Sequence, residues 1–202
     1  MPRDLRGHVR RAVFQKIIPF ALLMIAFGAV LSIWHEHRTA NGEKTLPDMS
    51  ELALAAEHCD IDDLVIDEEA GTVELLDPEM SLDVGAIAKG YAVEMIAREL
   101  AEMGVSGYAI SAGGNVRLIG SKPGGENWSI GIENPDPYAS YIETLSLSNK
   151  SVVTSGSYQR YYTVGDKSYH HIVDKDTLFP SVHFQSVSVI TENSAVADAL
   201  ST

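Results

Sequence analysis

The stretch Ser81–Met103 constrains the fold most, because a short extended segment turns at Gly85 and continues directly as a helix. Apolar residues then recur at the spacing of one helix face, namely Ile87, Tyr91, Met95, Ile96 and Leu100. Gly104 suits the end of this helix. The first expected helical turn, residues 85–89, contains small residues and one cation, Lys89. Free N–H groups beside a lysine suit a phosphate-bearing ligand, although a tightly packed turn with a surface lysine explains the same residues.

The rest of the chain predicts an α+β fold, a mostly antiparallel sheet with flanking helices. Runs of alternating apolar and polar residues, separated by turn residues, indicate strands and hairpins. The expected strands are residues 64–67, 72–76, 108–111, 116–119, 128–132, 142–147, 151–154, 161–164, 168–173 and 185–191. Hairpins are expected to pair 64–67 with 72–76, 142–147 with 151–154, and 161–164 with 168–173. Helices are expected over residues 48–58 and, after Asn193 or Ser194, to Thr202.

Residues 1–34 differ in composition from residues 35–202, which we expect to form the main domain. Five of the 15 Lys and Arg residues lie in residues 1–16, ahead of the roughly 18 uncharged residues Ile17–Trp34. A basic flank before an apolar run is typical of an uncleaved signal anchor. That interpretation predicts membrane contact through residues 17–34 and a location in the cell envelope, on the outer face of the inner membrane. The alternative is a helix buried in the protein core.

Charge and cysteine content exclude some function classes. The net charge is −13, and the basic segment accounts for only one of the 28 acidic residues. Such an acidic body argues against nucleic-acid binding, which needs clustered Lys and Arg, and suits divalent cations. The single cysteine, Cys59, excludes an internal disulfide and a thiolate metal cage.

Asp198 and Thr202 form the first of three polar groups that fit metal or phosphate chemistry. On the expected last helix they are i and i+4, so their oxygens share one face. A carboxylate and a hydroxyl, with carbonyl oxygens from a nearby turn, suit Mg²⁺. The alternative is a surface aspartate and a threonine at a fraying helix end.

The second group is the histidine pair His170-His171. If both lie in a strand, they face opposite ways, so one can face a site while the other does not. A neutral imidazole is a competent general base near pH 7, and a structural role is the alternative.

Glycine and hydroxyl residues supply the third group. Gly113-Gly114, between two expected strands, allow either a close backbone approach to a ligand or a plain tight turn. The segment Thr154–Tyr158 reads as a hydroxyl-rich loop that either binds phosphate or makes a turn.

Taken together, these segments resemble the ApbE family of flavin transferases, the FAD:protein FMN transferases. The matching segments are LDVGAIAKGYAVE (Leu82–Glu94), ISAGGNVRLIG (Ile110–Gly120), WSIGIENP (Trp128–Pro135), VVTSGSYQRYY (Val152–Tyr162), HHIVDKDT (His170–Thr177) and SVSVITENSAVADALST (Ser186–Thr202). Six segments in the family's order are specific, whereas any one of them alone is not.

The resemblance implies an enzyme that uses Mg²⁺ to transfer FMN from FAD to a threonine or serine of an acceptor flavoprotein, releasing AMP. It implies the Ala86 carbonyl, Asp198 and Thr202 as Mg²⁺ ligands and His171 as the base that deprotonates the acceptor. The implied flavin-nucleotide contacts are Lys89, Gly113, Gly114, Ser155, Tyr158 and Asp174. Two alternatives are an FAD pyrophosphatase that gives FMN and AMP, and a catalytically weak flavin-binding remnant.

The chain departs from the family pattern in two respects. The family usually has Asp-Pro-x-Thr-Gly after the His-Ile pair, where this chain has Asp174–Leu178. Because leucine resists positive φ, we expect different turn chemistry in this loop. The resemblance also predicts that the chain is shortened at both ends relative to the family.

Overall fold

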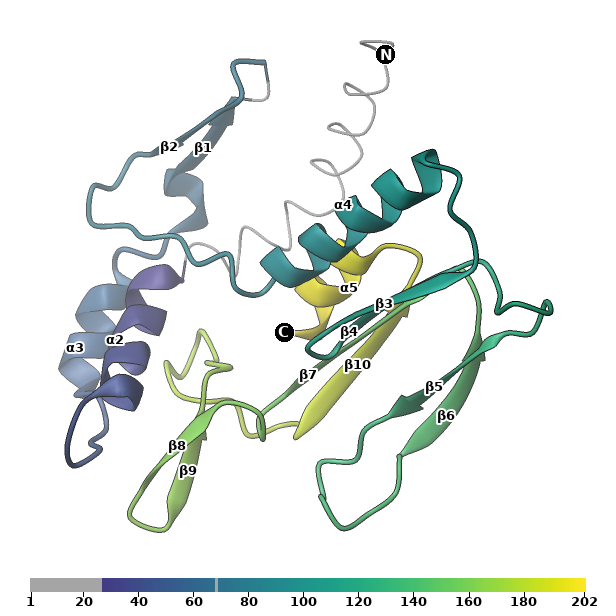
Figure 1. Cartoon of the computed structure of the whole chain (residues 1–202). Helices are drawn as coiled ribbons and strands as arrows, with labels where there is room; N and C mark the ends of the chain where they lie inside the picture. Colours follow the sequence, from purple (N-terminus) through teal and green to yellow (C-terminus); the bar gives the residue numbers. More distant parts are fainter. Residues whose placement is uncertain (1–26, 68) are drawn as a thin grey trace. The chain divides into compact units, whose positions relative to one another are not determined.

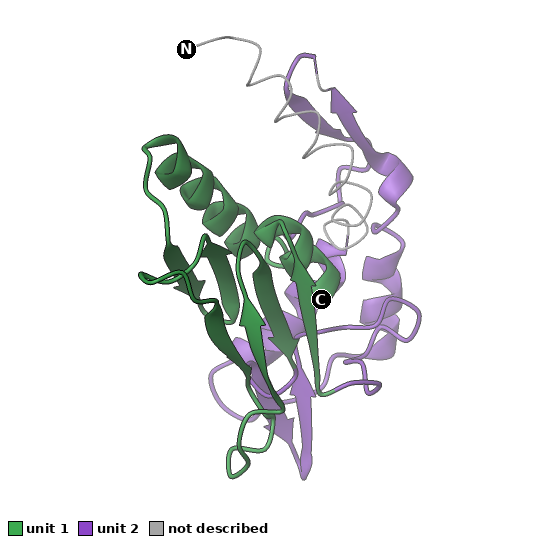
Figure 2. Ribbon diagram, turned by 90° about the vertical axis from the view of Figure 1, so that its right-hand side faces the viewer, with its two compact units in different colours: residues 1–18, 85–156, 185–202 green, residues 19–84, 157–184 purple. Residues whose placement is uncertain are grey.

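The computed structural model describes residues 27–67 and 69–202, which form parts of two compact units (Figure 2). Residues 85–156 and 185–202 belong to the first unit. The second unit contains the described part of residues 19–84 together with residues 157–184. Both units combine helices with antiparallel strands, which confirms the predicted α+β class.

The first unit is built on a four-stranded antiparallel sheet in the order β10-β7-β4-β3 (Figure 1). Its strands are β3 (Tyr108–Ala112), β4 (Asn115–Ile119), β7 (Ser151–Gly156) and β10 (Ser186–Thr191). Helices α4 (Ala88–Glu102) and α5 (Ser194–Ser201) pack on this sheet and against each other. Asn193 caps α5 by accepting hydrogen bonds from the N–H groups of Ala195 and Val196, as the sequence predicts.

Gly113 and Gly114 form the two-residue turn between β3 and β4. Both have positive φ, 50° and 85°, and their flanking residues Ala112 and Asn115 are paired. A tight hairpin turn with positive φ at both central residues favours glycine. The turn therefore accounts for glycine at both positions.

The predicted pairing of residues 142–147 with 151–154 is wrong. Strand β6 (Glu143–Leu147) pairs with β5 (Trp128–Ile132), whereas β7 lies between β4 and β10. Asn149, with φ of 53°, turns the chain between β6 and β7, and its side chain accepts a hydrogen bond from Gly120 N–H. The sequence signal for a turn was real, but the turn joins two different sheets.

Helix α4 begins later and buries another face than predicted. Residues 85–87 form a turn, and the helix starts at Ala88. Its buried residues are Gly90, Val93, Glu94 and Ala97. The predicted apolar residues Tyr91, Met95 and Ile96 are exposed. At Gly90 a small residue faces inward, because Ser194 and Asp198 of α5 approach this position closely.

The described part of the second unit contains two helices, a 3₁₀ turn and two hairpins. Its elements are α2 (Gly28–Thr39), α3 (Met49–Ala56), η1 (Ile61–Asp63), β1 (Leu64–Asp67), β2 (Thr72–Leu75), β8 (Tyr161–Val164) and β9 (Lys167–His170). Strands β1 and β2 form one hairpin and β8 and β9 the other, both as predicted. Asp48 caps α3 by accepting a hydrogen bond from Ser50 N–H.

Trp34 lies at the centre of this unit's core. Its ring packs edge-on against Phe179 with 5.2 Å between centroids and also contacts Tyr162 and Tyr169. Its indole N–H donates to the Leu178 carbonyl at 2.9 Å. Trp34 and Val30 join Leu52 of α3, Tyr162 and Val173 in one buried cluster.

Residues 28–34 of the apolar amino-terminal segment are therefore part of α2, which packs in a protein core. Residues 17–26 lie outside the described residues. Among the helices that the structure describes, none is long and apolar enough to cross a membrane. Membrane contact through residues 17–34 stays a prediction.

Candidate functional site

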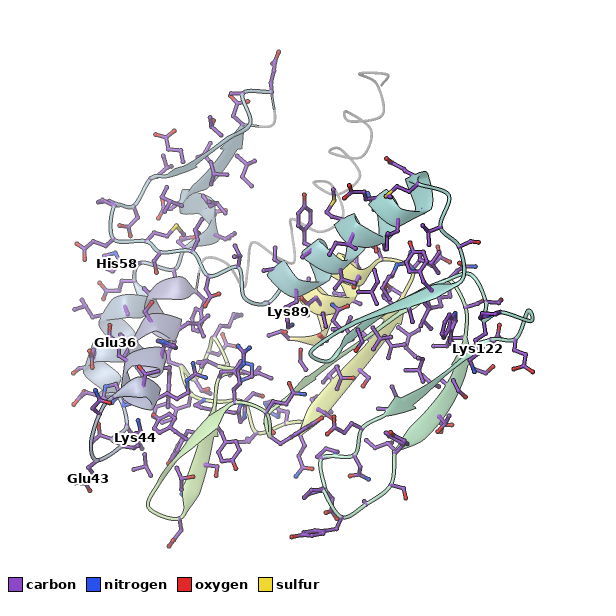
Figure 3. All side chains as sticks on the ribbon, viewed as in Figure 1. Glu36, Glu43, Lys44, His58, Lys89 and Lys122 are labelled. Atoms are coloured by element: carbon purple, nitrogen blue, oxygen red, sulfur yellow. The ribbon has the colours of Figure 1, made fainter. Side chains whose placement is uncertain are left out.

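The buried carboxylate of Asp198 is the centre of the candidate site. Its side chain is 1% exposed on α5, and it accepts hydrogen bonds from two neighbouring residues of α4. Gly90 N–H donates to Oδ2 at 2.7 Å, and Lys89 Nζ donates to Oδ1 at 3.1 Å. Lys89 is labelled at the start of α4 in Figure 3. The structure thus brings together two of the residues that the sequence predicted, Lys89 and Asp198.

Asp198 satisfies a helix end that has no cap of its own. The N-cap of α4, Ile87, makes no side-chain capping bond, and Gly90 is within the first helical turn. The first N–H groups of a helix lack partners within it and attract negative charge. The carboxylate of Asp198, which belongs to α5, therefore lies at the start of α4, where the sequence predicted an anion-binding site. It binds at Gly90, after the turn formed by residues 85–87.

Gly90 makes this close approach sterically allowed. A Cβ at this position would lie 2.4 Å from the Ser194 carbonyl oxygen and 2.5 Å from Asp198 Cβ. Real Cβ atoms do not come that near to other heavy atoms, so residue 90 must be glycine for α4 and α5 to pack at this distance.

A second buried carboxylate, Glu94, anchors the start of α5. It accepts hydrogen bonds from Arg117 Nε on β4 at 3.1 Å and from Ser194 N–H at 3.0 Å. Arg98 Nε also donates to it at 3.1 Å. These bonds join α4, α5 and the sheet, and therefore fix the helix that carries Asp198.

Hydroxyl groups gather at the other end of α5. Ser155 Oγ lies 2.9 Å from Ser201 Oγ and 3.1 Å from Thr202 Oγ1. Ser201 in turn donates to the Asp198 carbonyl at 3.0 Å. Ser155 belongs to strand β7, so the predicted loop over residues 154–158 begins only after Gly156. The structure brings Ser155 and Thr202 together.

The donors present fit a magnesium ion that is completed by phosphate oxygens. Within residues 27–67 and 69–202, no three His, Cys, Asp or Glu side chains are placed to hold a metal ion. Among the ligands that the resemblance implies, Asp198 is a buried carboxylate, and Thr202 and the Ala86 carbonyl are neutral oxygen donors of the kinds that Mg²⁺ accepts. Mg²⁺ in proteins is commonly held by one or two carboxylates together with substrate phosphates.

The two histidines differ in their hydrogen bonds. His170 Nε2 lies 2.7 Å from the Ser181 carbonyl, and its Nδ1 accepts from Ile172 N–H, so both ring nitrogens are used. His171 Nδ1 lies 3.2 Å from the Arg160 carbonyl. Because a carbonyl only accepts, Nδ1 carries the proton and Nε2 has the lone pair. Of the two histidines, His171 therefore has the ring nitrogen, Nε2, that can act as a base.

Burial lowers the pKa of His171, against the opposing effect of its hydrogen bond to Arg160. The neutral, basic form therefore persists below the ordinary histidine pKa. Strand β9 ends at His170, so the expected strand position of His171 is wrong. Its ring is placed instead by the bonds to Arg160 in the segment before β8.

The loop after the histidines closes around Asp174. Its Oδ1 accepts from the N–H groups of Asp176 and Thr177 and from the Thr177 hydroxyl, and these bonds lower the pKa of Asp174. Leu178 has φ of 59° and donates its N–H to the Asp174 carbonyl. The expected change of turn chemistry is therefore wrong, because leucine takes the left-handed conformation.

The predicted site residues are divided between the two units. Ala86, Lys89, Gly113, Gly114, Ser155, Asp198 and Thr202 lie in the first unit, and Tyr158, His171 and Asp174 in the second.

The model of the ApbE family matches residues 21–202. The chain belongs to the ApbE family. It is 31% identical over 204 residues to a FAD:protein FMN transferase of Klebsiella pneumoniae, an alignment that covers 96% of this chain and 62% of that protein.

The fold of this chain is similar to that of two solved structures. The ApbE protein of Thermotoga maritima aligns with a TM-score of 0.81 and 31% identity, over 100% of this chain and 64% of its own. The flavin transferase ApbE of Vibrio cholerae gives a TM-score of 0.77 and 28% identity, over 95% and 62%. This ApbE chain thus spans less than two thirds of each of these relatives.

Sequence reasoning about the ApbE chain missed Gly90 and Glu94. Both lie inside the quoted segment Leu82–Glu94. A glycine inside a helical pattern costs stability relative to alanine, and this irregularity marks Gly90 in the sequence. The local signal for Glu94 is only its i,i+4 pairing with Arg98, which is typical of an exposed helix face. The partners that give it its role, Arg117 and Ser194, lie 23 and 100 residues away.

Proposed function

We propose that this chain transfers FMN from FAD to a threonine hydroxyl of an acceptor protein, with Mg²⁺ bound and AMP released. The proposal depends on one observation. The buried carboxylate of Asp198, on α5, binds Gly90 N–H and Lys89 at the start of α4. The names of the similar proteins, FAD:protein FMN transferases and flavin transferases, support the same activity.

In the proposed reaction, the chain's residues bind the diphosphate and activate the acceptor. Asp198, Thr202 and the Ala86 carbonyl would hold Mg²⁺, which neutralises diphosphate charge when bound. Lys89 contacts the phosphates as a point charge. Flavin-nucleotide contacts by Gly113, Gly114, Ser155, Tyr158 and Asp174 belong to the same proposal.

His171 acts as the general base through Nε2. It takes the proton from the threonine hydroxyl as that oxygen bonds to the FMN phosphorus. The bond between this phosphorus and the bridging oxygen breaks, and AMP leaves with that oxygen. The products are AMP and a protein carrying FMN through a phosphoester.

The test incubates the full chain with FAD, Mg²⁺ and a threonine-containing acceptor peptide, and follows the peptide by mass spectrometry and the nucleotides by chromatography. We expect FMN on the peptide and an equal amount of AMP. Asp198→Ala should abolish both products, whereas Asp166→Ala, an exposed acidic residue of the β8–β9 turn, should not. Free FMN with AMP and an unmodified peptide would instead show an FAD pyrophosphatase. Unchanged activity of Asp198→Ala would refute the metal assignment.

A further inference from the structure

Lys89 and Asp198 form an ion pair whose two members differ in freedom. The Asp198 side chain is 1% exposed, whereas that of Lys89 is 44% exposed. Gly90 N–H holds Oδ2 from the helix backbone, and the lysine ammonium covers Oδ1. Oδ1 is therefore the carboxylate oxygen whose partner can change without any movement of α4.

A second buried carboxylate, Glu94 of α4, pairs with arginine side chains that have less freedom than Lys89. It is bound by Arg117, whose side chain is 11% exposed, and by Arg98 on its own helix. Arginine is always charged and its planar group is held at a fixed geometry, whereas lysine carries a compact charge on a flexible stem. Among the described ion pairs, Lys89 supplies the one cation that reaches Asp198.

A divalent cation and the Lys89 ammonium compete for the same oxygen. Two positive charges at one carboxylate oxygen repel each other. A buried carboxylate also needs a positive partner, so Lys89 leaves Asp198 at little cost only when another cation replaces it. Phosphate oxygens of a bound nucleotide offer Lys89 an alternative partner.

We propose that Lys89 is an exchangeable cation, which pairs with Asp198 in the free protein and moves to the phosphates of a bound nucleotide, so that Mg²⁺ and the nucleotide bind cooperatively. This inference rests on the proposed function. Removing the ammonium from Oδ1 raises the affinity for Mg²⁺, and Mg²⁺ on Asp198 releases the ammonium for the phosphates. By linkage, each ligand raises the affinity of the other by the same factor.

The experiment measures Mg²⁺ binding to the full chain by titration calorimetry, with and without FAD. Without FAD, Lys89→Met should bind Mg²⁺ about tenfold more tightly than the native chain, within the usual range of coupling effects. FAD should raise the Mg²⁺ affinity of both chains, because its phosphates also bind the metal, but the factor should be several-fold larger for the native chain than for Lys89→Met. Lys89→Arg keeps a cation and should bind Mg²⁺ without FAD as weakly as the native chain.

Lys150→Met is the matched control. Lys150 pairs with Glu192 at 3.0 Å in the same unit, in an exposed ion pair away from Asp198. The loss of its charge should change the Mg²⁺ affinity less than twofold. Circular dichroism of each variant confirms that the chain is folded.

The outcomes separate this inference from the proposed function. If Asp198→Ala abolishes Mg²⁺ binding but Lys89→Met binds no more tightly than the native chain, the exchange is refuted and the metal site stands. An equal gain in Lys150→Met would also refute it, because the effect would then be general electrostatics. Mg²⁺ binding that survives Asp198→Ala, or no binding by any variant, refutes the metal site and the exchange together.

Discussion

At the scale of single residues, His171 and Leu178 have properties that only their surroundings give them. His171 obtains a defined tautomer from the Arg160 carbonyl, and burial favours its neutral form. Leu178 adopts a backbone conformation that leucine rarely takes. Each property leads to a measurement.

The pH dependence of the proposed reaction should report the lowered pKa of His171. A lowered pKa means that the neutral base is still present at pH values where an ordinary histidine is protonated. The acidic limb of kcat/KM should therefore lie below pH 6.5, the ordinary histidine value. His171→Ala should lower kcat by about 10²- to 10⁴-fold and remove that limb, whereas the exposed His183→Ala should change neither. An acidic limb above pH 6.5 would contradict the assignment.

The backbone strain at Leu178 should be measurable from the stabilities of two variants in which its side chain is shortened. Leu178→Ala and Leu178→Gly both lose the contacts of the leucine side chain with the core, but only glycine takes φ of 59° freely. The glycine variant should be more stable than the alanine variant by about 1 kcal/mol in urea unfolding. At Leu54, exposed on helix α3, the order should be reversed. An alanine variant at least as stable as the glycine variant at position 178 would show that the turn is not strained.

At the scale of elements, the contact between α4 and α5 positions the candidate site. Gly90 permits the approach, and Glu94 ties the first residue of α5 to α4 and β4. Tyr91, Met95 and Ile96 of the predicted apolar face are exposed, because the face that meets α5 and the sheet is instead the one with Gly90, Val93, Glu94 and Ala97.

Gly90→Ala should reverse the usual effect of replacing glycine by alanine in a helix. Alanine normally stabilises a helix by about 1 kcal/mol. At position 90 the added methyl group meets Ser194 O and Asp198 Cβ, so the chain should lose about 1–3 kcal/mol of stability. Urea unfolding measures this loss. Ala92, on the exposed side of α4, is the reference, and Ala92→Gly should show the ordinary preference for alanine. A stabilised Gly90→Ala variant would contradict the close packing.

At the scale of the whole molecule, the acidic excess is the dominant electrostatic property. The chain has 28 acidic residues against 15 Lys and Arg, which gives the net charge of −13. Self-repulsion of this charge opposes the compact state and is screened by salt.

The melting temperature should therefore rise with NaCl between about 0.01 and 0.15 M, over which the screening length falls from about 30 to 8 Å. Differential scanning fluorimetry at neutral pH measures this directly. An equal concentration of sucrose serves as the uncharged control and should have less effect. A melting temperature that falls as salt is added would mean that attractive ion pairs outweigh the repulsion.

Local chemistry explains what could be predicted from the sequence. The cap at Asn193, the end of α4 before Gly104, the glycine turn at 113–114 and the β8–β9 hairpin depend on residues next to each other in the chain. Turn and cap preferences act over this range, so the pattern carries them. Local patterns also singled out Lys89 and Asp198 separately, and the family resemblance implied roles for both at one nucleotide site. Their ion pair joins residues 109 positions apart.

Only the tertiary structure decided which strands pair, which face of α4 is buried and which histidine keeps a basic nitrogen that no described residue binds. Strand β7 pairs with β4 and β10 instead of its neighbour β6, because side-chain burial across the sheet outweighs closeness in sequence. Gly90 and Glu94 have their roles only because α5 returns to α4 about a hundred residues later. Such contacts depend on the spatial fit of distant segments, and no local run of residues encodes that fit.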